Sequence, residues 1–306
     1  MKRQVLILLS AAVLFVSSSA YAQQKTATPP AQKQSFDSNG VKINYIVKGE
    51  GEPVLLIHGF TGSYQMNWMP VIENLSKDYK VIAYDNRGHG QSGKPHDPSA
   101  YGLEMVEDAV RILDHVGVKK AHVVGYSMGG FITAKLLTVH PDRMISATLG
   151  GAGWTKPDDE LMTTFMNELA ESLETGKGVT PLILRLHPAG RPPLAPEALN
   201  SINQLLSLTN DVKALAAVVR GMRNFQVTES QWKENEVPVM ALIGEVDPLK
   251  QGVDAMIGVV PNLEILVIEE ADHMNAFRRP EFVTAIRGFI GKHAEAKENA
   301  TASTAN

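Results

Sequence analysis

Cysteine is absent from the 306 residues of this chain. Its absence excludes disulfide bonds, a thiol nucleophile, thiolate metal ligands and lipid attachment through a cysteine. Exported proteins often carry disulfides, but a chain of this length can depend on a large buried core instead.

A strong excess of charge of one sign is also missing. The formal net charge is -4, from 29 basic and 33 acidic residues, and no long basic run occurs. Nucleic acid is therefore not an expected partner. The metalloprotease pattern H-E-x-x-H and the phosphate-binding pattern G-x-x-x-x-G-K-[ST] are absent as well. We expect neither a metal site nor an organic cofactor.

Apolar runs long enough to cross a bilayer, which takes about 20 residues, are lacking. The shorter run from Val5 to Val16 follows Lys2 and Arg3, and Ala20-Tyr21-Ala22 supplies small residues for cleavage. This pattern predicts a signal peptide over residues 1–22, and the short run disfavours the alternative of a membrane anchor. We expect a soluble mature protein, periplasmic or secreted, of bacterial type.

Two segments at the ends of the chain are poor in core-forming residues. Residues 23–33 are rich in Gln, Thr, Ala and Pro, and residues 294–306 are polar and small. Such compositions predict a flexible leader and a disordered tail.

Between these segments, short apolar runs alternate with stretches of helical period. Expected strands are Val41–Val47, Val54–Ile57, Val81–Tyr84, Ala121–Val124, Ile145–Leu149, Val237–Ile243 and Leu263–Ile268. Expected helices are Met105–Val116, Gly129–Val139, Gly252–Val259 and Glu281–Ile290. Continuous apolar strands alternating with helices predict a mainly parallel sheet with helices on both faces.

Residues 154–232 interrupt this alternation. They contain helical patterns at Leu161–Leu173 and Val212–Met222, a Pro-rich connection at His187–Pro196, and no convincing buried strand. We expect a helical cap here, inserted into an α/β core of residues 34–153 and 233–293. A cap over the carboxyl edge of the sheet would cover the place where such sheets bind ligands.

The motif G-x-S-x-G occurs at Gly125–Gly129, between an expected strand and an expected helix. A serine on so sharp a turn takes a strained backbone conformation, and side chains at the two glycine positions would clash. The helix that follows points its N-terminus at the serine, which favours negative charge there. Ser127 is the predicted nucleophile.

His58-Gly59-Phe60 directly follows the expected strand ending at Ile57. Acyl transfer requires donors aimed at the developing oxyanion, and the N–H groups of Phe60 and Met128 are the candidates. His58 is interpreted as a structural residue that holds this loop.

The loop Asp85-Asn86-Arg87-Gly88-His89-Gly90-Gln91-Ser92 is predicted to be structural, with internal ion pairing and hydrogen bonds. Gly88, Gly90 and Gly93 satisfy the dinucleotide pattern G-x-G-x-x-G. Lys94-Pro95 follows where a helix should begin, so a dinucleotide site is rejected.

Together, the HGF loop, DNRGHGQS, GYSMGG and a late acid and histidine resemble the α/β-hydrolase fold family over residues 41–292. The resemblance implies a triad of Ser127, Asp247 and His273, because the family order is serine, acid, histidine. Members that act as haloalkane dehalogenases or epoxide hydrolases carry aspartate at the nucleophile position, so the serine disfavours those activities.

Two other acids near the expected site are less suitable than Asp247. Glu245 fits the family pattern less well, and Asp272 adjoins His273 and is poorly placed to bond its ring. Among the histidines, His273 alone is expected in a loop just after a late strand.

This triad predicts a serine hydrolase that works through an acyl-enzyme without a cofactor. A carboxylic ester is the expected substrate, since apolar residues, including Trp154, indicate an apolar pocket with Phe60 and Met128. A carbon–carbon bond hydrolase and a cofactor-free peroxidase remain open as alternatives, as does a non-catalytic receptor for small molecules.

Overall fold

The computed structural model describes residues 34–294. The predicted signal peptide, residues 1–22, and the predicted leader, residues 23–33, lie outside this range. So does the predicted disordered tail, apart from its first residue. These three expectations stay predictions.

A single eight-stranded sheet forms the centre of the protein, in the order β1-β2-β4-β3-β5-β6-β7-β8. Its strands are β1 (Gln34–Ser38), β2 (Val41–Lys48), β3 (Glu52–Ile57), β4 (Tyr79–Tyr84), β5 (Ala121–Tyr126), β6 (Met144–Gly150), β7 (Val239–Gly244) and β8 (Leu263–Ile268). Strand β2 pairs antiparallel with both β1 and β4, and all the other neighbouring strands pair parallel. The predicted mainly parallel sheet is confirmed.

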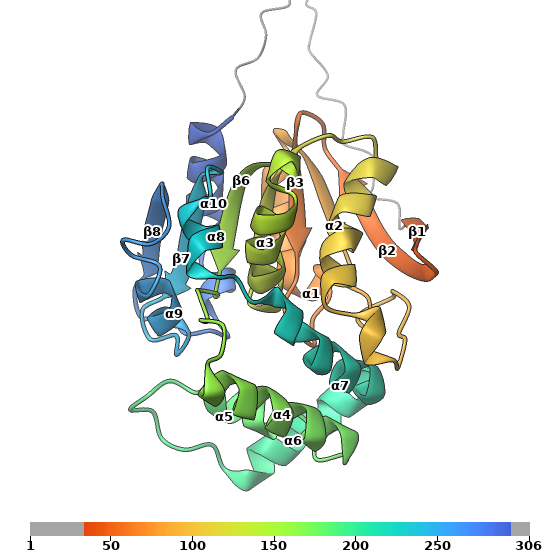
Figure 1. The fold of residues 1–306 in the computed structure, drawn as a ribbon. Helices are drawn as coiled ribbons and strands as arrows, with labels where there is room; N and C mark the ends of the chain where they lie inside the picture. Colours follow the sequence, from red (N-terminus) through yellow and green to blue (C-terminus); the bar gives the residue numbers. More distant parts are fainter. Residues whose placement is uncertain (1–33, 295–306) are drawn as a thin grey trace, which may run out of the picture.

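Helices cover both faces of this sheet, as predicted (Figure 1). The helices of the core are α1 (Tyr64–Leu75), α2 (Leu103–His115), α3 (Met128–Val139), α9 (Lys250–Asp254) and α10 (Pro280–Lys292). Helices α1 and α10 share one apolar cluster that includes Trp68 and Phe282, whereas α2 and α3 share another that includes Met105 and Ile132. The fully buried strands therefore have an apolar layer on each side, which explains their continuous apolar runs.

Two elements of the core were not predicted. Helix α1 contains Pro70 in its interior, and proline is usually a helix breaker. Its buried residues Trp68, Ile72 and Leu75 nevertheless keep helical spacing, and the Ser63 side chain caps the first turn by accepting from the Met66 N–H at 3.2 Å. Strand β1 is largely exposed and mostly polar, so its sequence carries little strand signal.

The predicted helix Gly252–Val259 is wrong in its bounds, because α9 covers Lys250–Asp254 and turns follow it. Gly258 has a φ of 74°, a left-handed conformation that no α-helix contains. The apolar spacing there reflects Val253, Met256 and Val260 packing from a turn-rich segment into the core.

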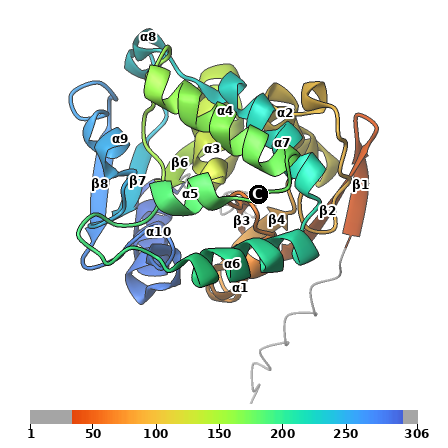
Figure 2. The same ribbon diagram turned by 90° about the horizontal axis from the view of Figure 1, so that it is seen from below.

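Five helices lie between β6 and β7 in the sequence; the first four cover the carboxyl edge of the sheet, whereas the fifth, which contains the buried Trp232 of the core cluster, lies beside the sheet (Figures 1 and 2). They are α4 (Glu160–Glu174), α5 (Thr180–Arg185), α6 (Pro196–Thr209), α7 (Val212–Gly221) and α8 (Glu229–Lys233). Helix α7 has two apolar sides. Leu215 and Val219 belong to a cluster with α4, whereas Ala217 and Val218 belong to the cluster of the core. The predicted helical cap insertion is thus present, and α7 attaches it to the core.

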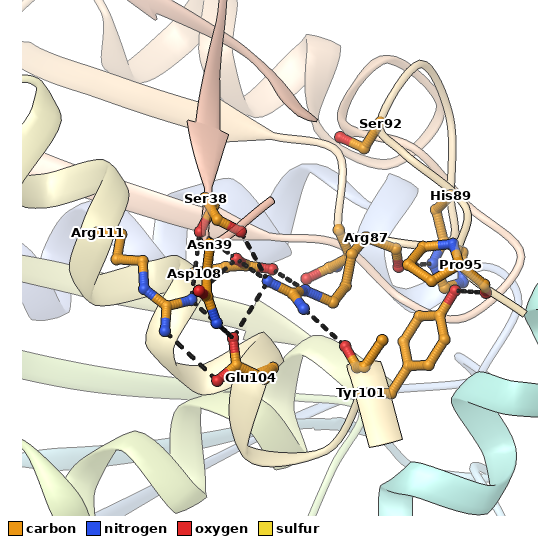
Figure 3. Close-up of polar contacts among 12 residues, drawn as sticks. Ser38, Asn39, Arg87, His89, Ser92, Pro95, Tyr101, Glu104, Asp108 and Arg111 are labelled. Carbon is orange, nitrogen blue, oxygen red and sulfur yellow. Dashed lines mark hydrogen bonds and ion pairs between the residues drawn. The ribbon is translucent and has the colours of Figure 1, made fainter. Parts of the chain in front are cut away.

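The loop after β4 is held by a buried ion pair that reaches α2 (Figure 3). Arg87 donates to Asp108 from Nε and from Nη2, each at 2.7 Å, and to the carbonyl oxygen of Ala100 at 2.6 Å. Ser38 donates from Oγ to the same aspartate at 2.5 Å. The structural role predicted for this loop agrees with these contacts, but the ion pair runs to another element and not within the loop.

Candidate active site

Ser127 lies between the end of β5 and the start of α3, with φ 53° and ψ -118°. This conformation is costly for a residue with a Cβ, by about 1–3 kcal/mol, and persists only when surrounding contacts enforce it. Its N–H donates to the Gly150 carbonyl at 2.8 Å, and its carbonyl accepts from Gly130 at 2.8 Å. The sharp turn expected from G-x-S-x-G is therefore present.

The two glycines of this motif are required by close backbone approach. A Cβ on Gly125 would lie 2.0 Å from the Gly129 carbonyl oxygen, and a Cβ on Gly129 would lie 2.0 Å from the Ile57 carbonyl oxygen. Both neighbours are backbone atoms that cannot move aside. The strand-to-helix turn therefore tolerates glycine alone at both positions.

His273 and Asp247 lie against Ser127, as the expected strand ends implied. The His273 Nε2 is 2.9 Å from the Ser127 Oγ, and its Nδ1 is 2.8 Å from Asp247 Oδ2. Both side chains are almost fully buried, with exposed fractions of 4% and 0%. A carboxylate can only accept, so Nδ1 carries the proton and Nε2 is left to accept from the serine hydroxyl.

Further contacts hold this histidine in place. The Tyr126 hydroxyl donates to the His273 carbonyl oxygen at 2.6 Å, and Asp247 Oδ1 accepts from the Leu249 N–H at 2.9 Å. The imidazole can therefore neither turn nor exchange its two nitrogens without breaking buried hydrogen bonds.

The competing acids have other partners. Asp272 accepts from the N–H groups of Met274 and Asn275 and pairs with Arg191 at 2.8 Å. Glu245 accepts from the Glu270 N–H at an exposed position. Neither carboxylate has a hydrogen bond to the His273 ring, in agreement with the preference for Asp247.

Two backbone N–H groups next to Ser127 are available as donors. Among the described residues, the N–H groups of Phe60 and Met128 donate to no protein acceptor, and both residues line the cavity that contains Ser127. A Cβ on Gly59 would lie 3.3 Å from the Ser127 Cβ, so the HGF loop passes directly over the serine. Their role as an oxyanion hole stays a prediction.

Both ring nitrogens of His58 hold this loop in place. Its Nδ1 donates to the Gly59 carbonyl at 2.8 Å, and its Nε2 accepts from the Asn86 N–H at 2.9 Å. Complete burial lowers the pKa of His58 to about 4, which keeps the ring neutral and its two bonds intact. The interpretation of His58 as structural agrees with these contacts.

A cavity of about 640 Å³ opens over Ser127 between the cap and the sheet edge. Most of its walls are apolar, and they include Phe60, Met128, Phe131 and Trp154. Trp154 also donates from Nε1 to the Val227 carbonyl at 2.8 Å, which ties the entry of the cap to its exit. Trp154 therefore has a structural contact, and its contact with substrate stays a prediction.

The cavity also has polar lining residues that were not predicted from the sequence. Asn67 lines it from α1 with a buried Oδ1 that has no hydrogen-bond partner among the described residues. Four arginines from four separate segments also line it, namely Arg185, Arg191, Arg223 and Arg278. A capping serine, Ser63, followed by apolar residues at helical spacing could have revealed α1 and hence Asn67. No local pattern marks the arginines.

Within residues 34–294, no group of three His, Cys, Asp or Glu side chains is arranged to hold a metal ion. In the same range, none of the helices combines the length and the apolar character needed to cross a membrane.

Comparison with protein families matches residues 52–177 to the model described as alpha/beta hydrolase fold. Over 123 residues, 40% of this chain, the sequence is 39% identical to a protein named carbamate hydrolase RutD from Azorhizobium caulinodans. It is 40% identical over 120 residues to the acetyltransferase component of the acetoin cleaving system of Cupriavidus necator. The chain matches only 45% and 32% of the lengths of these two relatives.

Solved structures resemble this protein over a larger part of the chain. An epoxide hydrolase from Vigna radiata superposes with a TM-score of 0.67 and 23% identity, covering 86% of this chain and 98% of that one. A bacterial membrane phospholipase A superposes with a TM-score of 0.66 and 22% identity, covering 87% of both chains. At these identities the likeness establishes the fold alone.

Proposed function

We propose that this chain, which has the α/β-hydrolase fold, is a serine hydrolase that cleaves carboxylic esters through an acyl-enzyme on Ser127. The observation that carries the proposal is the pair of hydrogen bonds of His273, at 2.9 Å to Ser127 Oγ and at 2.8 Å to Asp247 Oδ2. A base bonded on one side to a hydroxyl and on the other to a buried carboxylate is the arrangement that activates a serine.

The proposed reaction follows from this arrangement. His273 Nε2 takes the hydroxyl proton as Ser127 Oγ attacks the ester carbonyl carbon, and Asp247 stabilises the imidazolium that forms. The N–H groups of Phe60 and Met128 hold the oxyanion. The imidazolium then protonates the leaving alcohol, and water activated by the same histidine releases the acid.

The apolar cavity above Ser127 supports an ester with an apolar acyl chain. Pockets of about 300–1,000 Å³ bind small organic molecules, and apolar walls give affinity in proportion to the apolar area that they cover. The name of the carbamate hydrolase does not extend to this chain, because the match covers 40% of it. The nucleophile Ser127 argues against epoxide opening, for which the family uses an aspartate.

A fluorophosphonate probe and an ester panel test the proposal. We expect the probe to label the wild-type protein and not Ser127→Ala. We also expect Asp247→Asn to lower kcat by about 10⁴-fold, because the histidine would be held in the wrong tautomer. Ester hydrolysis that persists in Ser127→Ala would contradict the proposal.

The panel separates the remaining alternatives. It should include a carbamate, a vinylogous diketone for carbon–carbon cleavage, and a peroxidation assay. Turnover of one of these without ester turnover would replace the ester assignment, whereas binding without probe labelling would indicate a receptor.

A further inference from the structure

The charge of the active-site cavity is opposite to that of the whole protein. The formal net charge of the chain is -4, yet four arginines and a single acidic residue line this cavity. The arginines are Arg185, Arg191, Arg223 and Arg278, and the acid is Asp272. Arg191, Arg223 and Arg278 are exposed and Arg185 is half-buried. The cations therefore keep contact with solvent at the cavity, where they can meet an anionic group of an incoming ligand, and a neutral apolar ester gives them no partner.

Two of the four arginines already have side-chain partners. Arg191 pairs with Asp272 at 2.8 Å, and Arg223 donates to Asn167 Oδ1. Arg185 and Arg278 have no carboxylate partner among the described residues. Their guanidinium groups lie over the rings of Phe165 and Phe277, at 4.8 and 5.2 Å from the ring centres. Stacking of this kind orients the guanidinium and leaves its in-plane N–H donors available.

Arg278 and Arg191 lie on the histidine side of the site. Arg278 ends the short helix η4 (Ala276–Arg278), which follows His273, and the Asp272–Arg191 pair directly precedes that histidine. Arg185 stacks on Phe165 of the cap and lines both the main cavity and an adjoining one of about 450 Å³. Leu249, two residues after Asp247, lines both cavities as well, and Lys156, Asp158 and Asp159 line the adjoining one. His273 protonates the leaving alcohol in the proposed reaction, so this side of the cavity receives the alcohol portion of the ester.

We propose that the substrate is an amphiphilic ester whose alcohol portion carries an anionic group, and that Arg278 and Arg185 bind this group. The inference rests on the proposed function. Carboxylate, sulfate and phosphate share the required chemistry, since each accepts paired N–H···O bonds from a guanidinium. The apolar walls then receive the acyl chain, which explains the presence of both kinds of surface in one cavity.

Matched esters of one acyl chain test the inference. The neutral ester is 4-nitrophenyl octanoate, and 3-carboxy-4-nitrophenyl octanoate carries the anion on the leaving group. The 4-nitrophenyl monoester of suberic acid carries it at the far end of the acyl chain. Octanoylglycerol and octanoylglycerol phosphate extend the comparison from carboxylate to phosphate. Rates with the aryl esters are divided by their rates with hydroxide, which removes differences in intrinsic reactivity.

We expect kcat/KM for the ester with the anionic leaving group to exceed that of the neutral ester by about tenfold or more. Arg278→Met and Arg185→Met should each remove most of this preference, mainly through KM. The quantity that the two variants should lower is the ratio of the two kcat/KM values, anionic over neutral ester. Arg279→Met is the matched control, because Arg279 is exposed, adjoins Arg278 and does not line the cavity. It should keep the full preference.

Equal kcat/KM for the neutral and anionic esters would overturn the inference, as would a preference for the anion on the acyl chain. A preference that survives in both Arg278→Met and Arg185→Met would also overturn it. In these cases hydrolysis that still depends on Ser127 leaves the proposed function standing. Loss of that dependence, or no ester hydrolysis at all, would refute both.

Discussion

Glycines surround Ser127 at positions where a side chain would not fit. A Cβ added to Gly125 or to Gly129 would lie 2.0 Å from a backbone oxygen, and a Cβ added to Gly59 would lie 3.3 Å from the Ser127 Cβ. Close backbone packing therefore enforces the strained conformation of Ser127, with its positive φ.

A pair of glycine variants tests this cause. Gly129→Ala should lower the free energy of unfolding by about 1–3 kcal/mol or more, because the new methyl group overlaps the Ile57 carbonyl. Gly288→Ala, on the exposed face of α10 with no atom within 4 Å, should raise it by about 0.5–1 kcal/mol. Urea denaturation measures both. Equal effects of the two substitutions would contradict the steric explanation.

At the scale of elements, one buried ion pair joins three segments that are distant in sequence. Arg87 follows β4, Asp108 belongs to α2 and Ser38 ends β1. The loop that contains Arg87 also holds the HGF loop through the Asn86–His58 hydrogen bond. The ion pair thus supports the active site from a distance.

A double-mutant cycle measures this pair. Arg87→Met alone and Asp108→Leu alone should each lower the free energy of unfolding by up to about 3–5 kcal/mol, because each leaves a buried charge without its closest partner. Only longer contacts then stay, from Asp108 to Arg111 at 3.7 Å and from Arg87 to Glu104 at 3.5 Å. The double variant should lose clearly less than the sum of the two. Lys233→Met, which removes the exposed pair with Glu229, should change stability by no more than about 0.5 kcal/mol. Strict additivity at Arg87 and Asp108 would contradict the coupling.

For the whole molecule, two buried histidines make folding sensitive to acid. Burial lowers the pKa of His58 to about 4, and burial together with the neighbouring His58 lowers the pKa of His89 to about 3. Both pKa values are near 6.5 in the unfolded chain. Between these limits the unfolded chain binds protons that the folded protein does not, so acid favours unfolding.

The free energy of unfolding should therefore be fully present above about pH 6.5 and decline as the pH falls toward 4. Each histidine contributes a slope of up to about 1.4 kcal/mol per pH unit. Urea titrations at pH values from 7.5 to 5 measure this decline before most carboxylates titrate. His89→Gln should reduce the slope, and a flat profile in the wild-type protein would contradict the pKa values.

Most of the architecture was predictable because sequence patterns over a few neighbouring residues determine it. Continuous apolar strands, helical spacing in α2, α3 and α10, and the G-x-S-x-G turn each depend on residues close together in the chain. Helix α1 was not predicted because Pro70 interrupts its apolar period, since proline usually ends a helix. Strand β1 was not predicted because an exposed edge strand needs few apolar residues. The error in α9 came from equal spacing of apolar residues in a segment that turns at Gly258.

The sequence by itself determined the parallel sheet, the strained serine turn, and the strand ends at which Asp247 and His273 stand, since each follows from residues a few positions apart. Only the tertiary structure decided that the His273 ring lies 2.8 Å from Asp247 while Asp272 turns away to Arg191. It alone brought Arg185, Arg191 and Arg278 to one cavity, because they come from segments as far apart as α5 and η4. Side chains from separate segments meet only through packing, and no local pattern encodes that meeting.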